Sequence, residues 1–443
     1  MKKEDKCKTQ LSESIMVSES LRNNILTGVY DNTFSKLYPT TKNTAAERYA
    51  EAIDKFVEIF GDGEIRLFSA PGRTEVGGNH TDHQHGCVLA ASVDLDVIAV
   101  AKINNDNVIR IQSKGYKMDE IDLNILTPQD NETEHAASLI RGVAARFKEL
   151  GYNIGGFDAY TTSNVLKGSG LSSSAAFEVL VCTMLNGLYN DGKMNSVDKA
   201  IVSQFAENKF FGKPCGLMDQ MACSVGGFVA IDFNDVAKPV IEKVDFDFNS
   251  VEHALCIVDT GGSHSDLTDD YAGIPTEMKS VAEYFGKAVL RDVDENEFYA
   301  KMQELREKVS DRAILRSMHF FDDNNRAVLL RDALKNGNFE QFKSIILESG
   351  FSSLTMLQNV FSSANPAEQG LTLALSLTKR ILNGKGAYRV HGGGFAGTIQ
   401  AFVPNDILFT YKTEIEKVFG QGSCYVLSIR PVGGVEITPE LFN

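Results

Sequence analysis

Proline is scarce in this 443-residue chain, and basic side chains are outnumbered by acidic ones. Ten prolines are too few for a collagen-like or proline-rich low-complexity chain. The 59 Asp and Glu residues against 44 Lys and Arg residues give a net charge of −15, which repels phosphate backbones and anionic lipid headgroups, and no local basic patch offsets it. We therefore expect neither a nucleic-acid partner nor a membrane partner.

Paired cysteine motifs and long hydrophobic runs are also missing. The seven cysteines form no CxxC pair, and most stand singly among apolar residues, where a buried reduced thiol is expected. The longest apolar-rich segment, residues 87–103, carries Asp94 and Asp96, and no apolar stretch follows the N-terminal lysines. These features predict no signal peptide, no membrane span and a cytosolic location.

What remains is the composition of a folded globular protein, with 43% apolar and 23% charged residues. Hydrophobic periodicity and turn residues predict helices within the first sixty residues, at 135–150, 175–189 and 196–210 and across 275–385, and strands at 65–67, 88–103, 108–112, 157–161, 227–233, 398–404 and 424–429. We divide the chain into a helical N-terminal extension (1–60), an N-terminal lobe (61–230) and a C-terminal lobe (231–443).

A run of glycine and serine at 168–174, GSGLSSS, comes directly before a predicted apolar helix. Backbone N–H groups and hydroxyls at the positive end of a helix can bind an anion, so the run indicates a phosphate-binding loop. Taken alone, it is equally consistent with a flexible turn that ends in a serine N-cap. The chain contains no GxxxxGK[ST] sequence, so an ordinary Walker A site is not supported.

A second glycine-rich run, residues 392–397, has the sequence GGGFAG and formally fits GxGxxG. A strand-like stretch follows it where a dinucleotide-binding site needs a helix, so a Rossmann site is excluded. The run is either a tight turn between strands or a second glycine-rich wall beside the phosphate-binding loop.

The densest polar run, residues 71–85, is too hydrophilic for a core and too rich in glycine for a helix, so we interpret it as a loop at a binding site. Its His80, Asp82, His83 and His85 include metal-ligand types, but no HExxH sequence or distant Cys/His pair completes a first coordination shell. Closely spaced Asn, His and Asp side chains favour hydrogen bonding to a hydroxyl-rich ligand such as a sugar.

Read jointly, APGR with GGNHTDHQHG, then GSGLSSSAA, then HGGGFAG resemble the three signature motifs of the GHMP small-molecule kinases, and within them of the galactokinases. A fourth segment, residues 206–220, resembles the catalytic segment of that family. The resemblance covers about residues 66–436. It implies an α+β fold of two lobes, with the active site in the cleft between them, and a kinase that uses ATP and Mg²⁺.

The resemblance also implies roles for single residues. Asp219 matches the aspartate that takes the proton from the sugar's anomeric hydroxyl, and Arg73 matches the arginine beside it, which keeps that aspartate ionised. Ser174 and Glu207 match the magnesium ligands, whose oxygens suit a hard cation. The positions that match ATP contacts are Gly168, Ser169, Gly170, Leu171, Ser172, Ser173 and Ser174, with Ser113 corresponding less securely. The positions that match sugar contacts are Asn79, His80, Thr81, Asp82 and Tyr271. Without the joint pattern, Asp219 would be interpreted as a helix cap and Glu207 as a solvated helix residue.

The sugar-binding segment departs from the family. Galactokinases usually have Asn-Leu-Ile-Gly-Glu-His-x-Asp-Tyr where this chain has Glu75-Val-Gly-Gly-Asn79-His-Thr-Asp-His83. The glutamate that contacts the sugar's 6-hydroxyl is replaced by the neutral Asn79, which would tolerate a carboxylate at C6. We therefore predict an ATP-dependent kinase that converts galactose to galactose 1-phosphate, with a kinase for another sugar such as galacturonate, or a catalytically silent galactose-sensing regulator, as alternatives.

Overall fold

The computed structural model describes residues 17–165, 170–213, 215–262 and 267–442, and Gly168 and Ser169 lie outside these ranges. Its helices are α1 (Val17–Leu26), α2 (Asp31–Leu37), α3 (Lys42–Phe60), α4 (Ala136–Glu149), α5 (Ser173–Asn190), α6 (Ser196–Ala206), α7 (Met218–Val225), α8 (Thr268–Tyr284), α9 (Glu295–Ala300), α10 (Met302–Arg306), α11 (Asp311–Lys335), α12 (Phe339–Ser352), α13 (Gly370–Leu382) and α14 (Leu408–Phe419). Its strands are β1 (Arg66–Gly77), β2 (Cys87–Ile103), β3 (Val108–Ser113), β4 (Asp119–Asp122), β5 (Phe157–Ser163), β6 (Phe228–Asp232), β7 (Val240–Val244), β8 (His253–Asp259), β9 (Ala387–Val390), β10 (Thr398–Pro404), β11 (Cys424–Leu427) and β12 (Val435–Glu436).

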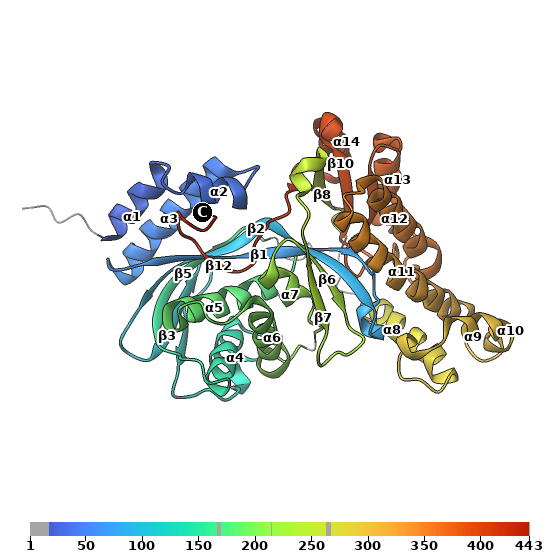
Figure 1. Cartoon of the computed structure of the whole chain (residues 1–443), viewed down its shortest axis with the longest axis horizontal. Coiled ribbons are helices and arrows are strands. Elements are labelled where there is room, and N and C mark those ends of the chain that lie inside the picture. The colour runs from blue at the N-terminus through green and yellow to red at the C-terminus, as the bar shows by residue number, and fades with distance from the viewer. Residues whose placement is uncertain (1–16, 166–169, 214, 263–266, 443) are drawn as a thin grey trace, which may run out of the picture.

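Two sheets organise the molecule (Figure 1), which confirms the predicted α+β class. The larger sheet has the order β12-β1-β2-β5-β3-β4. In addition, β6 pairs with residues 87–91 of β2, and β7 pairs with β6. The smaller sheet has the order β11-β8-β10-β9. Strands β1 and β2 are antiparallel and long enough to run from the N-terminal helices to the helices of the second half of the chain.

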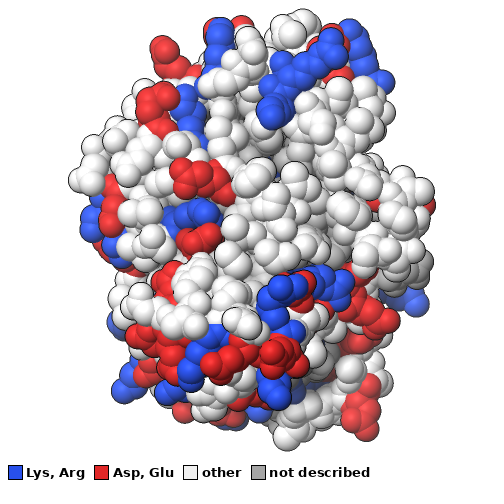
Figure 2. All heavy atoms as spheres, turned by 90° about the vertical axis from the view of Figure 1, so that its right-hand side faces the viewer, with Lys and Arg blue, Asp and Glu red and all other residues white. Residues whose placement is uncertain are grey.

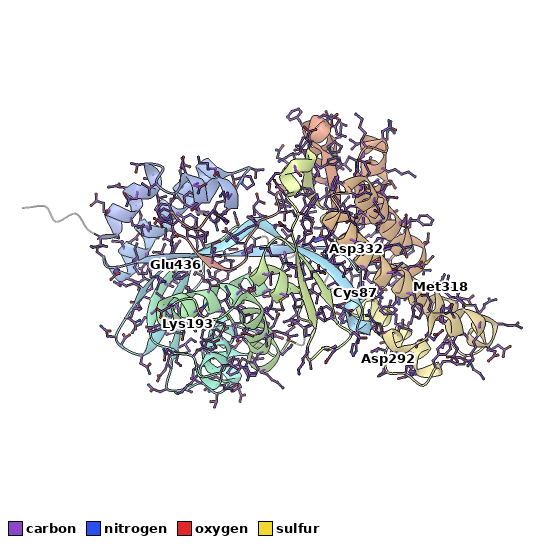
Figure 3. All side chains as sticks on the ribbon, in the orientation of Figure 1. Cys87, Lys193, Asp292, Met318, Asp332 and Glu436 are labelled. Atoms are coloured by element: carbon purple, nitrogen blue, oxygen red, sulfur yellow. The ribbon has the colours of Figure 1, made fainter. Side chains whose placement is uncertain are left out.

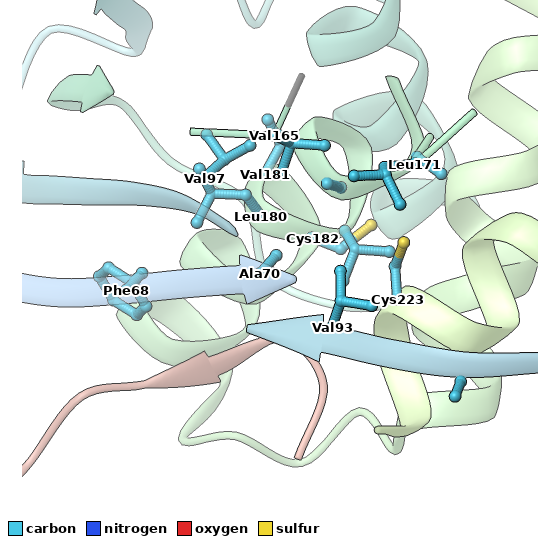
Figure 4. Close-up of a cluster of buried hydrophobic side chains, with 14 of the residues drawn as sticks. Phe68, Ala70, Val93, Val97, Val165, Leu171, Leu180, Val181, Cys182 and Cys223 are labelled. Atoms are coloured by element: carbon cyan, nitrogen blue, oxygen red, sulfur yellow. The ribbon is translucent and has the colours of Figure 1, made fainter. Parts of the chain in front are cut away.

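Helices cover both faces of the larger sheet, and the alternation of side chains along β1 and β2 explains why. Leu67, Ile98 and Val100 pack against α1–α3 on one face, whereas Phe68 and Ala99 pack with α4 and α5 on the other. Successive side chains of a strand point to opposite faces, so two apolar stripes require two helical layers. Figure 4 shows the second layer, where Leu180, Val181 and Cys182 of α5 lie over Ala70 and Val93.

The same core continues into the smaller sheet. Leu255 and Ile257 of β8 and Phe402 of β10 join it together with residues of α11 and α12. The opposite face of this sheet packs against α13 and α14. Figure 2 shows the side of the molecule that carries the helices of the second half, where charged side chains gather toward the upper and lower ends and the middle is mostly uncharged.

Most predicted elements are confirmed with shifts of a few residues, but the interpretation of residues 71–85 as a loop is wrong in its first half. Pro71–Gly77 belong to β1 and are buried. Arg73 and Glu75 lie inside the protein because each has a partner of opposite charge there, Asp219 and Arg389 respectively. Residues 17–60, the described part of the predicted N-terminal helical segment, contain three helices. Residues 392–397 form the turn between β9 and β10.

Two further findings concern the whole chain. Every cysteine within the described ranges is a free thiol. None of the helices in the described part of the chain has the length and apolar content needed to span a bilayer. The division into an extension and two lobes stays a prediction.

Candidate active site

Arg73 of β1 and Asp219 of α7 form a bidentate ion pair. Arg73 Nε donates to Asp219 Oδ1 over 2.7 Å, and Nη2 donates to Oδ2 over 2.9 Å. Burial raises the pKa of the Asp219 carboxyl, but the charge and hydrogen bonds of Arg73 outweigh this effect and hold the pKa below its usual value. The aspartate is therefore ionised at neutral pH, and a fork-shaped pair fixes its orientation.

The described part of the phosphate-binding loop lies directly against this pair. Arg73 Nη1 donates to the carbonyl of Gly170, and Ser172 Oγ donates to Asp219 Oδ2 over 2.5 Å. The backbone N–H of Arg73 donates to the carbonyl of the buried Leu171 over 3.1 Å. The loop approaches β1 so closely that a Cβ atom on Gly72 would meet this carbonyl at 2.8 Å. Helix α5 begins at Ser173, so the first backbone N–H groups of α5 lie next to the ion pair.

Carboxylates and an amide gather between α5, α7 and the π-helical turn Glu207–Phe211 that ends α6. Gln220 Nε2 donates to Glu207 Oε2 over 2.6 Å and to Glu178 Oε2 over 3.2 Å. Glu178 Oε1 and Gln220 Oε1 are buried and have no hydrogen-bond partner in the described part of the molecule. Burial, followed by the charge of Glu207, raises the pKa of Glu178 well above its usual value.

These oxygens fit the predicted metal. Hard cations such as Mg²⁺ bind oxygen ligands from one or two carboxylates while phosphates supply others. Ser174 lies one helical turn before Glu178 on α5, and Glu207 is connected to Glu178 through Gln220. Among the residues described, no group of three or more His, Cys, Asp or Glu side chains is placed to hold a metal ion by itself. A cation here would therefore need oxygens from a ligand such as a nucleotide.

We call residues 78–86 the sugar loop. Its amide side chain, Asn79, is completely buried and hydrogen-bonded only within the protein. Nδ2 donates to Glu75 Oε1 over 2.9 Å and to the Gly392 carbonyl over 2.8 Å. Oδ1 accepts from Asn359 Nδ2 over 2.8 Å and from Ser353 Oγ over 3.4 Å. An Asn side chain makes about four hydrogen bonds, so a contact between Asn79 and a sugar would require one of these bonds to break. That contact stays a prediction.

The next three residues of the sugar loop, His80, Thr81 and Asp82, differ from Asn79 in their surroundings. His80 Nε2 donates to the Gly393 carbonyl over 2.9 Å, and burial lowers the pKa of this imidazole to about 4, so Nδ1 is an acceptor at neutral pH. Thr81 is buried, and its hydroxyl contacts the carbonyls of Gly78 and Cys87. Asp82 lies beside the segment that leads into α7, because a Cβ atom on Gly216 would come within 3.4 Å of Asp82 Oδ2.

The glycine-rich turn 392–397 faces the sugar loop. Tyr271 of α8 donates its hydroxyl to the Gly394 carbonyl over 2.8 Å. His391, at the start of the turn, is buried between the hydroxyls of Thr74 and Thr398, and burial lowers its pKa to about 3. The structure confirms the tight turn between strands, which was one of the two interpretations of this run, and its role as a wall of a binding site stays a prediction.

Among the predicted residues that the structure describes, Ser113 lies apart from this group. It ends β3, which β2 and β5 separate from β1, and its hydroxyl accepts from Thr161. Sequence reasoning also missed Glu178, Gln220, Arg389 and Asn359. Glu178 and Gln220 stand close in sequence to Ser174 and Asp219 and could have been suspected on that ground. Arg389 and Asn359 carry no local signal, because their partners Glu75 and Asn79 are 314 and 280 residues away.

Two family models match segments that carry residues of the candidate site. The family model of the GHMP kinases N terminal domain matches residues 138–227, which include the phosphate-binding loop, Glu207 and Asp219. The galactokinase galactose-binding signature matches residues 54–103, which include Arg73 and the sugar loop.

Solved structures share the fold. The Lactococcus lactis galactokinase, solved in complex with galactose, superimposes with a TM-score of 0.72 at 24% identity over 88% of this chain and 99% of that chain. The Methanococcus jannaschii mevalonate kinase superimposes with a TM-score of 0.60 at 15% identity over 83% and 99%. A D-glycero-D-manno-heptose 1-phosphate kinase from Bacteroides thetaiotaomicron gives 0.57 at 16% identity over 85% and 99%. Residues 138–227 are thus similar to the N-terminal domain of the GHMP kinases, residues 54–103 are similar to the galactokinase galactose-binding signature, and the chain shares the fold of the solved kinases.

Proposed function

We propose that this protein is a sugar kinase that transfers the terminal phosphoryl group of ATP to the anomeric hydroxyl of galactose, giving galactose 1-phosphate and ADP. The observation that carries the proposal is the Arg73–Asp219 ion pair, which contacts the phosphate-binding loop through Gly170 and Ser172. A carboxylate that stays ionised next to a phosphate site is the group that such a transfer requires.

The reaction follows from these positions. Asp219 Oδ1 accepts the proton of the anomeric hydroxyl while the bond between that oxygen and the terminal phosphorus forms. The bond from this phosphorus to the bridging oxygen breaks at the same time, and ADP leaves. Arg73 keeps Asp219 ionised and offsets the negative charge that develops during transfer. Phosphoryl transfer otherwise depends on positioning and on electrostatic stabilisation.

We assign the nucleotide and the metal to the phosphate-binding loop and to the carboxylates between α5, α7 and the turn that ends α6. Gly168, Ser169, Gly170, Leu171, Ser172, Ser173 and Ser174 are proposed to bind the phosphates, with Ser113 as a more distant nucleotide contact. Ser174 and Glu207 would hold the Mg²⁺, and the unpartnered oxygens of Glu178 and Gln220 nearby support this assignment. A bound Mg²⁺ would neutralise charge on the nucleotide phosphates.

We assign the sugar to the surface that the sugar loop and the glycine-rich turn form together. His80 offers Nδ1 as an acceptor, Asp82 offers a carboxylate near the segment that leads to Asp219, and Tyr271 borders the turn. Asn79 and Thr81 are buried in the loop and would shape the site from within.

Galacturonate is the second candidate, and the hydrogen bonds of Asn79 favour it. The position that carries a carboxylate in galactokinases carries here a neutral amide that is saturated by the protein. The carboxylate that is hydrogen-bonded to Asn79, Glu75 of β1, is neutralised by Arg389. Without a protein carboxylate facing C6 of the sugar, the site does not repel the C6 carboxylate of an acidic sugar.

A coupled assay of ADP release over a panel of free sugars tests the proposal. We expect turnover with galactose that depends on ATP and Mg²⁺. If kcat/KM for galacturonate exceeds that for galactose by more than about tenfold, which is about 1.4 kcal/mol in transition-state stabilisation, the acidic sugar replaces galactose as the proposed substrate. Absence of turnover with every sugar, combined with sugar binding, would indicate a sensor.

A further inference from the structure

Asn79, at the start of the sugar loop, is held by the side chains of a single turn of helix α11. The backbone N–H of Asn79 donates to Asp323 Oδ2 over 2.9 Å. The backbone carbonyl of Asn79 accepts from His319 Nε2 over 3.0 Å. His319 and Asp323 are four residues apart on α11, and both are fully buried. They therefore hydrogen-bond the carbonyl and the N–H of Asn79 from the same face of the helix.

The other end of the loop is held by the next residue of the same helix. The backbone N–H of Cys87 donates to Asn324 Oδ1 over 2.8 Å, and Arg291 Nη1 donates to the same oxygen over 3.0 Å. Gly86 lies so close to Asn324 that a Cβ atom there would meet Oδ1 at 3.0 Å. In Figure 3, Cys87 lies where the strands of the larger sheet meet the helices of the second half, beside the segment that carries Met318.

Two of these side chains of α11, His319 and Asp323, are fixed in turn by α12 and by their own helix. His319 Nδ1 accepts from Ser352 Oγ over 2.8 Å. Asp323 Oδ2 also accepts from Ser349 Oγ over 3.1 Å, and Asp323 Oδ1 accepts from Arg326 over 3.3 Å. Removal of one of these groups would leave a buried backbone donor or acceptor unpaired, which is costly.

The loop depends on such anchors because its backbone is unusual. His80 and His85 both have left-handed conformations, with φ of 59° and 61°, which residues other than glycine adopt rarely. His80 also carries the imidazole that reaches the glycine-rich turn. By contrast, the phosphate-binding loop and Asp219 are held by β1, α5 and α7. Strand β1 thus contributes to both halves of the site, whereas the α11 side chains hold the backbone of the sugar loop.

We propose that His319, Asp323 and Asn324 are positioning residues for the sugar site, which set the loop geometry through Asn79 and Cys87 without contacting the substrate. This inference rests on the proposed function, because it assigns the loop to the sugar. Its consequence is a selective effect. Loss of an anchor weakens sugar recognition and leaves nucleotide recognition in place, since small displacements of positioning groups strongly affect transfer.

Asn324→Ala, Asn324→Asp and Asn325→Ala form the test set. Alanine at 324 removes the acceptor for the Cys87 N–H, and aspartate keeps an oxygen there. Asn325 is the neighbouring, exposed residue and serves as the matched control. We expect the sugar KM of Asn324→Ala to rise about five- to tenfold, as loss of one hydrogen bond allows, with the ATP KM within about twofold. Asn324→Asp should restore most of the loss, and Asn325→Ala should behave as wild type.

Equal increases in the sugar and ATP KM values, or no rescue by Asn324→Asp, would overturn the proposal. Amide hydrogen exchange of the wild type, Asn324→Ala and Asp323→Ala separates this failure from failure of the proposed function. If the wild type phosphorylates no sugar, the proposed function fails, and the positioning claim is decided by exchange alone. Faster exchange at Cys87 in Asn324→Ala and at Asn79 in Asp323→Ala, with α5 unchanged, supports it. Unchanged exchange at both amides contradicts it.

Discussion

Two ion pairs at the candidate site join segments that are far apart in sequence. Arg73 and Asp219 join β1 to α7, and Glu75 and Arg389 join β1 to β9. Replacing one partner of such a pair leaves the other as a buried charge without compensation, which costs about 3–5 kcal/mol. The effects of single substitutions therefore depend on whether charge, shape or both are changed.

Asp219→Asn removes the proton acceptor and keeps the shape of the side chain. We expect kcat to fall by about 10²–10⁴-fold, the contribution that is typical of a general base. The nucleotide Kd should stay within a few-fold of the wild-type value, and melting experiments should show a folded protein. Turnover within a few-fold of wild type would mean that Asp219 is not the base.

Glu207→Ala removes one oxygen from the candidate metal site. We expect the Mg²⁺ concentration for half-maximal nucleotide binding to rise by about tenfold or more, because losing a group around a metal commonly costs this much. A titration of nucleotide binding at varied Mg²⁺ measures the effect without turnover. Glu283→Ala, which removes an exposed carboxylate of α8, is the control, and identical titrations for both variants would assign Glu207 a role away from the metal.

At the scale of elements, sequence patterns predicted the helices, strands and turns whose type is set by their own residues. The apolar runs of α5 and β2 are long enough to define their type, and a tight turn, one of the two interpretations of residues 392–397, is confirmed. Strand β1 was partly missed because its second half is polar, and its burial depends on Asp219 and Arg389, which the local sequence does not reveal. The anchors on α11 were missed for the same reason, since His319 lies 240 residues from Asn79.

In the segment that joins β1 to the sugar loop, a carboxylate and an amide have swapped positions relative to galactokinases, and the sequence alone could not explain this. Galactokinases usually have Asn and Glu where this chain has Glu75 and Asn79, and here the two side chains are hydrogen-bonded to each other over 2.9 Å. The order of the two residue types is reversed while a carboxylate–amide pair is kept. We infer that neither residue can be exchanged alone without a large penalty.

A double-mutant cycle tests this coupling. Asn79→Glu places a second carboxylate next to Glu75, and like charges about 4 Å apart cost about 4 kcal/mol at an effective dielectric constant of about 20. Glu75→Asn leaves the buried Arg389 without its counter-charge. We expect the double variant Glu75→Asn/Asn79→Glu to recover at least about 2 kcal/mol of the summed losses in urea unfolding. Additive losses would show that the pair is not coupled.

At the scale of the whole molecule, one buried region joins the N-terminal helices, the larger sheet and the segment that follows the smaller sheet. Asp96 is fully buried and accepts hydrogen bonds from Tyr38, Arg48, Ser69 and Arg430. Asp94, nearby on β2, accepts from the Ser428 N–H over 2.9 Å and from Thr40 Oγ1 over 3.1 Å. The N-terminal helices are thus part of the folded unit.

Asp94 makes stability depend on pH. Burial raises the pKa of its carboxyl to about 6, above the unfolded value of about 3.9. The folded state therefore binds more protons between these values, and the contribution of Asp94 is fully present below about pH 4 and is lost as the pH rises through 6. Asp94→Asn keeps a hydrogen-bond acceptor for the Ser428 N–H. We expect its free energy of unfolding at pH 7.5 to exceed that of the wild type by up to about 3 kcal/mol, which gives a higher melting temperature. At pH 4 the two proteins should differ little. A lower melting temperature at pH 7.5 would contradict this assignment.

The identity of the product tests the central claim most directly. The wild-type protein is incubated with ATP, Mg²⁺ and galactose, and the product is examined by ³¹P NMR and for reactivity as a reducing sugar. Because the proposed transfer joins phosphorus to the anomeric oxygen, the account predicts a sugar phosphate that no longer reacts as a reducing sugar, formed in a one-to-one ratio with ADP. A phosphorylated product that keeps its reducing end, or ADP release without any sugar phosphate, would contradict it.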